Sequence, residues 1–569
     1  MEKTDRRKKR LGDLLVDAKV ITEEQLTNAL VQQKKTSDRK LGEVILDLGY
    51  TNELQIAFAL KEQLNYDIIQ LSAIKIPEDI LALINDKSLL RKYVIIPFSF
   101  HDNNPNILRV AMADPMDIAA IDDVSILTNL RIEPVIATPS DVLAAIDKYY
   151  GSAEAQDIAT QYSQEIQQQY QRGEDLNLAY NADINSSPIV ILVRSIIEQG
   201  VRQRASDVHI EPYENRVRVR YRVDGVLFEA MTYQIELLSA IVSRIKIIGE
   251  MDISEKRKPQ DGRITIMVDR REYDIRVSIL PTVFGEKIVM RLADKKALNK
   301  SKADLGLNVE ELEKFDKLLT HPHGMLLVTG PTGSGKSTTL YTALSELNNN
   351  EVNIITVEDP VEANIDGINQ VQVNVKADMT FANVLRSILR QDPDIIMIGE
   401  IRDSETAAIA VKASITGHLV VSTLHTNSAA STITRLVDMG VEPYLLADAT
   451  VGVIAQRLVR RLCKCKHARP AETIEKSLLG ANLYEEIELY DPTGCNLCNG
   501  TGYRGRIGIY EIMPISPKLK DIISSQGTAA DIQEAALAEG MKTLQDSAAD
   551  YVLQGITSIA EMKRVTIED

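Results

Sequence analysis

The stretch Gly330-Pro331-Thr332-Gly333-Ser334-Gly335-Lys336-Ser337 matches the phosphate-loop pattern G-x-x-x-x-G-K-[ST] at every fixed position. The apolar run 325–329 before it is typical of a buried strand, and residues 338–347 after it are typical of a helix. Glycines let the backbone curl until successive N–H groups face one anion, and a helix N-terminus adds a favourable dipole. The strand, loop and helix together therefore predict phosphate binding rather than a simple glycine-rich turn.

Two side chains of this loop have distinct expected roles in binding a nucleotide. Lys336 would reach the β- and γ-phosphates of ATP, and the Ser337 hydroxyl would be a ligand of Mg²⁺. We expect the nucleotide to contact the whole loop and the start of the helix, that is Gly330, Pro331, Thr332, Gly333, Ser334, Gly335, Lys336, Ser337 and Thr338.

Length and composition indicate a multidomain globular protein. The chain has 569 residues, of which 44% are apolar and 26% charged. Its net charge of −16 argues against a general nucleic-acid-binding surface. No apolar run approaches the length of a membrane span, and the charged start 1–10 is unlike a secretory signal. We therefore expect a cytoplasmic protein whose membrane contact is peripheral.

Residues 1–65 contain an internal repeat. One unit runs from Arg10-Leu11-Gly12 to Gln33, and the other from Lys40-Leu41-Gly42 to Gln63. Two helix pairs are too few for a solenoid and can be scaffold alone, yet a basic residue beside a glycine also suits an anion or a stacked base.

This repeat resembles the MshEN module, a tandem motif that binds cyclic di-GMP. The resemblance implies ligand contacts from Arg10, Leu11, Gly12, Gln33, Lys40, Leu41, Gly42 and Gln63. Two positions depart from the pattern, because Lys40 stands where arginine is usual and Ala18-Lys19 stand where glycine is common. Lysine lacks the planar fork with which arginine stacks on guanine and binds it through two hydrogen bonds.

The middle of the chain divides into three parts. Residues 66–150 alternate strands and helices without evident chemistry, which favours a docking domain. Residues 151–187 are rich in Gln, Glu, Asn and Ser, a composition typical of a flexible linker. Basic and apolar residues alternate over 217–222 as in a half-exposed strand, so we expect an α+β domain over 188–300.

The last part, 301–569, carries the phosphate loop. Strands expected at 352–357, 395–398 and 419–423 are separated by helices, which predicts a parallel α/β sheet. Ligands bind such sheets at the carboxyl ends of the strands, where the loop also lies.

Acidic residues and histidines follow or flank these strands. Glu358 and Glu400 each follow a strand, and Glu400 ends a Walker B-like run in which Gly399 replaces the usual aspartate. Such a carboxylate can orient the attacking water or hold Mg²⁺ through water. His418 and His425 flank the strand 419–423, where a histidine can sense the γ-phosphate.

Four cysteines, Cys463, Cys465, Cys495 and Cys498, form two close pairs. Four thiolates suit a tetrahedral structural Zn²⁺. In a cytosolic protein, a metal site is favoured over a disulfide. The spacing of Cys463 and Cys465 is one residue shorter than in the usual C-x-x-C pair, so His467 remains an alternative ligand.

Taken in chain order, these motifs resemble the secretion ATPases, most closely the type IV pilus assembly ATPases. The matching segments are 206–212, 256–263, 280–286, the phosphate loop, the acidic stretch 358–362, the strand before Glu400 and the stretch 418–425. The resemblance implies a RecA-like phosphate-loop domain with a zinc-binding knob at 463–498, preceded by an α+β, PAS-like domain and a mostly helical amino-terminal module.

The same resemblance implies a function. It implies a homo-hexamer at the inner membrane that hydrolyses ATP with Mg²⁺ and acts on a membrane platform protein and other pilus assembly proteins, not on a nucleic acid polymer. Glu400 and Glu358 would be the catalytic and Mg²⁺-ordering acids, and Arg276 and Arg291 would complete the site across domains or subunits. Alternatives are a type II secretion ATPase, a cyclic di-GMP- and ATP-gated sensor without turnover, and a DNA motor, which the acidic balance disfavours.

Overall fold

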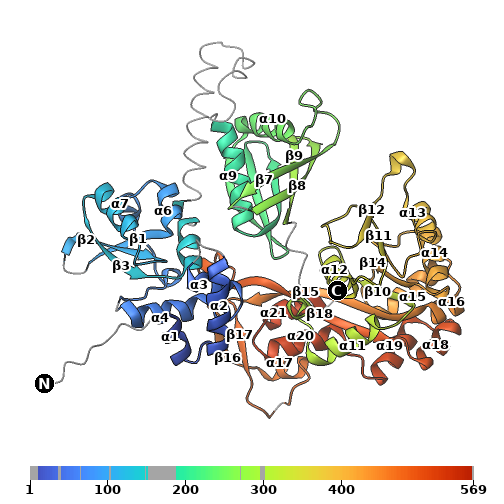
Figure 1. Ribbon diagram of the computed structural model, residues 1–569. Coiled ribbons are helices and arrows are strands. Elements are labelled where there is room, and N and C mark those ends of the chain that lie inside the picture. Colours follow the sequence, from blue (N-terminus) through green and yellow to red (C-terminus); the bar gives the residue numbers. More distant parts are fainter. Residues whose placement is uncertain are drawn as a thin grey trace. The chain divides into compact units, whose positions relative to one another are not determined.

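The computed structural model describes residues 11–35, 40–64, 66–101, 104–147, 149–150, 188–269, 271–294, 301–482 and 484–566 (Figure 1). These residues form two compact units, one of 1–199 with the short loop 494–501, and one of 200–493 with 502–569. Arg10 and the predicted linker 151–187 lie outside the described residues.

The predicted repeat forms two helix pairs. They are α1 (Leu11–Asp17) with α2 (Glu23–Lys35), and α3 (Leu41–Asp47) with α4 (Glu53–Leu64). A Cβ on Gly12 would lie 2.6 Å from Leu26 Cδ1, so a larger residue there would require the Leu26 side chain to shift. The repeated glycine therefore has a packing role in the first unit, whatever its role towards a ligand.

The rest of the amino-terminal unit contains a three-stranded sheet. Its strands are β1 (Ile95–His101), β2 (Asn104–Met112) and β3 (Arg131–Ile136), with β1 antiparallel and β3 parallel to β2. The helical elements are η1 (Leu71–Ala73), α5 (Glu78–Leu81), α6 (Lys87–Tyr93), α7 (Ile118–Thr128) and helical backbone over 139–147. The described residues of 66–150 thus contain both strands and helices, as the sequence predicts.

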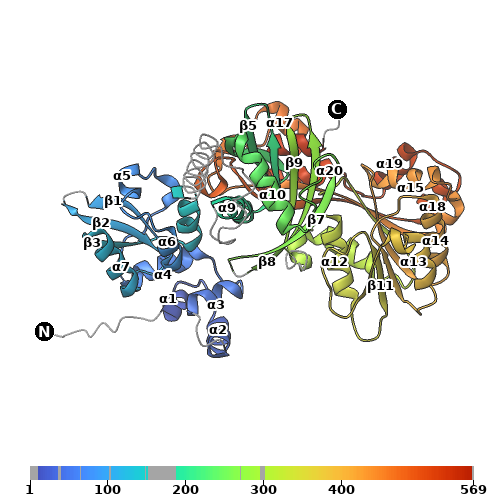
Figure 2. The same ribbon diagram turned by 90° about the horizontal axis from the view of Figure 1, so that it is seen from above.

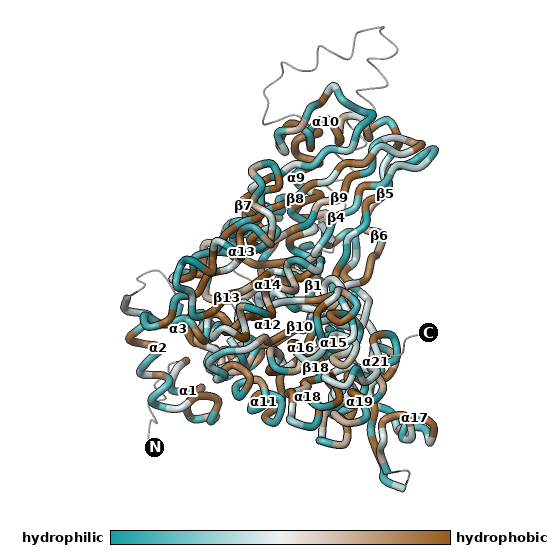
Figure 3. Tube along the Cα trace, turned by 90° about the vertical axis from the view of Figure 1, so that its right-hand side faces the viewer, coloured by the Kyte–Doolittle hydropathy of each residue, from teal (hydrophilic) through white to brown (hydrophobic). Residues whose placement is uncertain are grey.

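The carboxy-terminal unit begins with a six-stranded antiparallel sheet in the order β6-β5-β4-β9-β8-β7. Its strands are β4 (Ala205–Pro212), β5 (Arg216–Val223), β6 (Val226–Gln234), β7 (Gln260–Val268), β8 (Arg271–Thr282) and β9 (Gly285–Asp294). The helical elements η3 (Ile235–Leu237) and α10 (Leu238–Ile248) lie between β6 and β7 in the chain, and α9 (Pro188–Arg202) precedes β4. Arginine and apolar residues alternate along β5, visible as teal and brown in Figure 3, and Val217, Val219 and Tyr221 are buried. This confirms the expected α+β organisation.

The phosphate-loop domain is built on a seven-stranded sheet in the order β12-β11-β13-β14-β10-β15-β18. Its strands are β10 (Gly324–Thr329), β11 (Ile354–Glu358), β12 (Asn369–Gln372), β13 (Ile395–Ile398), β14 (Leu419–Leu424), β15 (Thr450–Leu462) and β18 (Tyr503–Pro514). The first six strands are parallel, which confirms the expected parallel sheet, and they include the four strands predicted from the sequence. The seventh strand, β18, pairs antiparallel with β15 at the edge of the sheet, away from β11 and β13.

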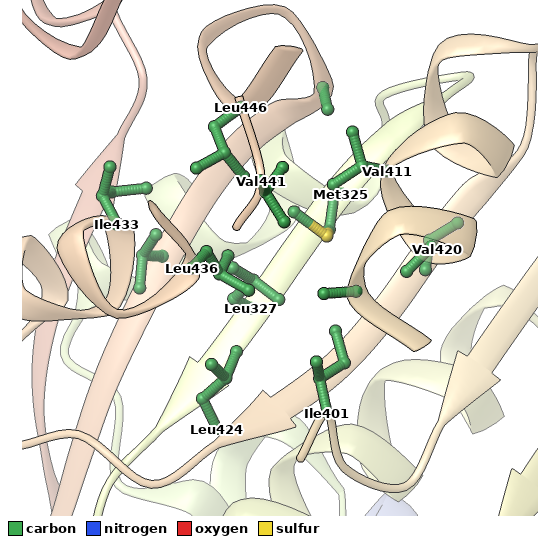
Figure 4. Packing of buried hydrophobic residues seen from close by; sticks show 14 of the residues in the cluster. Met325, Leu327, Ile401, Val411, Val420, Leu424, Ile433, Leu436, Val441 and Leu446 are labelled. Atoms are coloured by element: carbon green, nitrogen blue, oxygen red, sulfur yellow. The ribbon is translucent and has the colours of Figure 1, made fainter. Parts of the chain in front are cut away.

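Helices cover both faces of this sheet. On one face Leu326 and Val328 pack with residues of α11 (Val309–Leu319) and α12 (Lys336–Leu347). On the other face Met325 and Leu327 pack with α13 (Phe381–Ile388), α14 (Ser404–Ile415), α15 (Ala429–Asp438), α16 (Pro443–Ala449), α18 (Pro517–Ser524) and α19 (Ala529–Ala538). Figure 2 shows α12 and α13 on opposite sides of β11, and Figure 4 shows the second core from close by. Alternate residues of one strand thus supply two cores, which holds β10 and its loop rigidly.

The chain ends in shorter elements beside β15 and β18. They include β16 (His467–Pro470), α17 (Thr473–Leu478), β17 (Glu488–Asp491), η6 (Asn496–Cys498), α20 (Leu544–Leu553) and α21 (Ile559–Thr566); η4 (Lys302–Leu305) and η5 (Val375–Ala377) lie earlier in this domain. Within the described ranges, no helix has the length and apolar character needed to cross a membrane.

Candidate functional site

The phosphate loop connects the carboxyl end of β10 to the first residue of α12. Gly330 has a φ of 147° and Gly335 a φ of 94°. A Cβ at Gly330 would lie 2.3 Å from the backbone oxygen of Gln456, and one at Gly335 would lie 2.8 Å from its side-chain nitrogen. Only glycine therefore fits at these two positions, and the resulting backbone cradle at a helix N-terminus is suited to phosphate oxygens.

Lys336 points back into this cradle. Its Nζ donates to the carbonyl oxygens of Gly330 at 2.6 Å and Pro331 at 3.1 Å, and the residue is 8% exposed. Burial lowers the pKa of Lys336 to about 8, while the Glu400 carboxylate opposes the shift. A buried ammonium that donates to carbonyl oxygens is well placed to gain from a phosphate anion.

Glu400 and His425 meet at the same edge of the sheet. They follow β13 and β14, whose carboxyl ends lie in register with that of β10. The Nε2 of His425 lies 3.4 Å from Glu400 Oε2, and Arg402 Nη2 lies 2.5 Å from Glu400 Oε1. Burial and then the nearby Lys336 lower the pKa of His425, with Glu400 opposing, so its imidazole is neutral at pH 7.

Glu358 lies at the end of the neighbouring strand β11 and is 3% exposed. A Cβ on Gly399 would lie 3.3 Å from both Glu358 Cα and the Val357 carbonyl oxygen. An aspartate at 399 would therefore press on the end of β11. Glycine at the usual aspartate position thus has a steric reason.

Three predicted residues lie elsewhere or have other partners. His418 precedes β14, at the opposite end of a strand about 20 Å long, and its Nδ1 lies 2.9 Å from the Ala413 carbonyl oxygen. The structure therefore does not bring His418 to the phosphate loop of its own chain, contrary to our expectation. Arg291, with a side chain 62% exposed, pairs with Asp207 inside the six-stranded sheet at 3.2 Å. Arg276 instead reaches Glu362, at 2.8 Å, in the acidic stretch after Glu358.

The four cysteines come together as predicted. The Sγ atoms of Cys463, Cys465, Cys495 and Cys498 all lie within 4.8 Å of one another. Those of Cys495 and Cys498 are 3.7 Å apart, close to the edge of about 3.8 Å expected for a tetrahedron with Zn–S bonds of about 2.3 Å. The donor set and the distances therefore fit a structural Zn²⁺, and the short Cys463–Cys465 spacing does not prevent both thiols from joining.

We expect purified protein to contain about one zinc per chain, measured by atomic emission. In Cys498→Ser the zinc is expected to be lost and the thermal midpoint to fall by about 5–10 °C, because metal affinity contributes folding energy. His467→Ala is the control, since His467 lies in β16 outside the cluster, and it should retain the metal. Full zinc content in Cys498→Ser would contradict the assignment.

In the amino-terminal repeat, the predicted ligand residues Leu11 and Leu41 begin α1 and α3, and Gln33 and Gln63 lie in α2 and α4. Lys40 pairs with Asp114, which raises the pKa of Lys40 and would compete with a phosphate for it. This pair was not predicted, because Asp114 lies far away in the sequence.

Sequence reasoning also missed Tyr341 and Gln370, which both bond Glu358. Tyr341 lies five positions after Lys336 on the phosphate-loop helix, which is a weak local signal, while the contact of Gln370 comes only from the pairing of β12 with β11.

A phosphate loop at the carboxyl edge of a mainly parallel sheet, with acids ending the neighbouring strands, defines a phosphate-loop nucleotide-binding domain. The family model described as "Type II/IV secretion system protein" matches residues 182–564, so the chain belongs to that family. A second model, described as "MshEN domain", matches residues 64–156. That range follows the repeat on which we based the resemblance.

The chain is 43% identical over 570 residues to the "Type IV pilus assembly ATPase PilB" of Myxococcus xanthus (strain DK1622), covering 98% of this chain and 99% of the relative. It is 41% identical over 552 residues to PilB of Pseudomonas aeruginosa, covering 95% and 93%. It is 49% identical over 385 residues to the "Type II secretion system ATPase E" of Vibrio cholerae, covering 68% and 76%. The likeness to these pilus proteins thus extends to the amino-terminal unit, beyond the shared phosphate-loop part.

Among solved structures, the Yersinia pseudotuberculosis ATPase DotB aligns with a TM-score of 0.51 and 21% identity, over 66% of this chain and 93% of that one. This likeness supports the fold assignment alone.

Proposed function

We propose that this protein hydrolyses ATP to ADP and phosphate. The observation that supports this most directly is the buried Lys336 in a glycine cradle, with Glu400 and His425 at the adjacent strand ends. Lys336 and the loop N–H groups bind the phosphates, Glu400 orients the attacking water, and neutral His425 accepts or donates a hydrogen bond beside it. Mg²⁺, which Ser337 would hold, neutralises charge on the phosphates. The test is phosphate release by the purified full-length chain with ATP.

The hydrolysis would drive pilus assembly. Likeness over 98% of the chain to a pilus assembly ATPase supports this role over type II secretion, since the likeness to the Vibrio cholerae type II secretion ATPase covers 68% of the chain. In this proposal the protein is a cytoplasmic homo-hexamer at the inner membrane, and movement of the α+β domain against the phosphate-loop domain acts on a platform protein. Deletion of the gene in its host should abolish surface pili, whereas loss of protein secretion with pili intact would favour the type II alternative.

The Lys336 pKa gives a pH dependence of nucleotide binding. Phosphate oxygens favour the ammonium form, so the pKa is higher with nucleotide bound than the value of about 8 without it. Below pH 8 the ammonium is already present and affinity is constant. Above pH 8 binding must take up a proton, so affinity falls, by about tenfold between pH 7 and pH 9. Titration with fluorescent ADP at fixed ionic strength measures this, and equal affinities at pH 7 and 9 would contradict it.

We further propose that the amino-terminal unit binds cyclic di-GMP, which would regulate the motor. The match to the MshEN domain over 64–156 and the repeat before it support this. Calorimetric titration of the full chain with cyclic di-GMP is expected to show saturable binding that is weakened in Lys40→Ala. If the heat measured with cyclic di-GMP is no larger than the heat measured with cyclic di-AMP, the second-messenger role is rejected. The ATPase proposal does not depend on this result.

A further inference from the structure

The hydroxyl of Tyr341 contacts both ends of the turn 358–362. Tyr341 lies on the phosphate-loop helix α12 and is 2% exposed. Its hydroxyl donates to Oε2 of Glu358 and accepts, at 3.1 Å, from the backbone N–H of Glu362. Burial and the Glu358 carboxylate raise the pKa of Tyr341, so the proton needed for donation stays on the phenol.

The other oxygen of Glu358 is held from the sheet. Its Oε1 accepts from Thr356 at 2.6 Å and from Gln370 Nε2 at 3.1 Å. Thr356 belongs to the same strand as Glu358, and Gln370 to the adjacent strand β12. Of these three donors, Tyr341 is the one that belongs to the phosphate-loop helix, so it links the helix to the carboxylate.

The other end of the turn is held by the α+β domain. Glu362 Oε2 pairs with Nη2 of Arg276 at 2.8 Å, and Arg276 lies on β8 of the six-stranded sheet. This ion pair connects β8 of the six-stranded sheet to the turn after β11 of the phosphate-loop domain. Because the turn is only five residues long, a displacement of Glu362 also moves the groups that Tyr341 holds together.

We propose that Tyr341 is a positioning residue that couples the Glu358 carboxylate to the Arg276–Glu362 bridge between the two domains. When Arg276 holds Glu362, the Tyr341 hydroxyl is fixed from both sides and fixes Oε2 of Glu358. When the bridge opens, Glu362 can shift, the donor to Oε2 is no longer fixed, and the carboxylate is held through Oε1 from the sheet. The coupling makes hydrolysis depend on the domain contact, and it rests on the proposed ATPase function.

Tyr341→Phe removes only the hydroxyl. We expect kcat for phosphate release to fall about tenfold to a hundredfold, because a hydrogen bond to a charged group is lost. Affinity for fluorescent ADP should stay within about twofold, since the loop and Lys336 do not depend on this hydroxyl, and half-maximal activity should need more Mg²⁺. Tyr503→Phe is the matched control, a buried tyrosine whose hydroxyl bonds Ser558 at 2.6 Å, and should retain the wild-type rate.

Glu362→Gln tests the same coupling without touching the buried phenol, and is expected to lower kcat with unchanged ADP affinity. If the two residues act as one unit, the double variant Tyr341→Phe/Glu362→Gln is no slower than the slower single variant. Losses that multiply would overturn the coupling, as would a wild-type rate in Tyr341→Phe. A wild-type chain that releases no phosphate would instead reject the ATPase function itself, and the coupling with it.

Discussion

In Lys336→Ala, ATP hydrolysis is expected to fall by about a hundredfold to a thousandfold in kcat/KM, because a buried charge partner of the phosphates is removed. Lys336 donates to the carbonyl oxygens of Gly330 and Pro331, and a nucleotide would take over these bonds. Affinity for fluorescent ADP should fall together with the rate. Phosphate release and ADP titration of the purified variant provide the two measurements.

The control for this variant is Lys412→Ala, which removes an exposed lysine from α14 of the same domain. This variant loses one positive charge, as Lys336→Ala does. Both the rate of phosphate release and the affinity for ADP should stay within about twofold of wild type, as is general for surface substitutions. Equal activity in Lys336→Ala and the wild type would reject the loop as the site of hydrolysis.

Glu400→Gln is expected to separate binding from chemistry. The glutamine side chain has the same size as glutamate but carries no negative charge and cannot accept a proton from the attacking water. We therefore expect kcat to fall by about a hundredfold to ten-thousandfold. Nucleotide affinity should be retained or rise, since Glu400 is a negative charge near the phosphates. Single-turnover hydrolysis and equilibrium binding distinguish this outcome from misfolding.

Glu405→Gln is the matched control, because Glu405 is an exposed glutamate that pairs with Arg386 on the same domain. Its rate should equal that of the wild type. Retained turnover in Glu400→Gln would show that another group activates the water. Glu358 would then be the next acid to test. Retained turnover in both Lys336→Ala and Glu400→Gln would leave a nucleotide-gated sensor as the better account of the loop.

The sequence predicted the parts of the site that lie close together along the chain. The loop, its strand and its helix form one contiguous pattern. Glu358 and Glu400 each follow an apolar run that is typical of a buried strand. The four cysteines were predicted as one cluster because thiol spacing is informative on its own. The antiparallel strand β18 was missed, since it pairs with β15 through contacts distant in sequence.

Side-chain partners were the least predictable part. His418 and His425 have the same local pattern around one strand, and only the direction of β14 places one of them at the phosphate edge and the other at the opposite edge. Arg276 and Arg291 both lie in strands of one sheet, yet Arg291 meets Asp207 and Arg276 meets Glu362. Sequence spacing does not predict such pairings, because they depend on strand register and domain packing.

The long strand β15 connects the phosphate loop to the thiol cluster. Gln456 lies beneath the glycine loop and accepts a hydrogen bond from Thr339 at 2.8 Å, and Cys463 of the thiol cluster follows directly after the end of the strand. Pairing with β18 runs along the span of about 23 Å between them, with one irregularity between Arg460 and Leu462. The residue beneath the phosphate loop and the first cysteine of the thiol cluster are therefore joined by one paired strand, so a displacement at either end strains the same ladder of backbone hydrogen bonds.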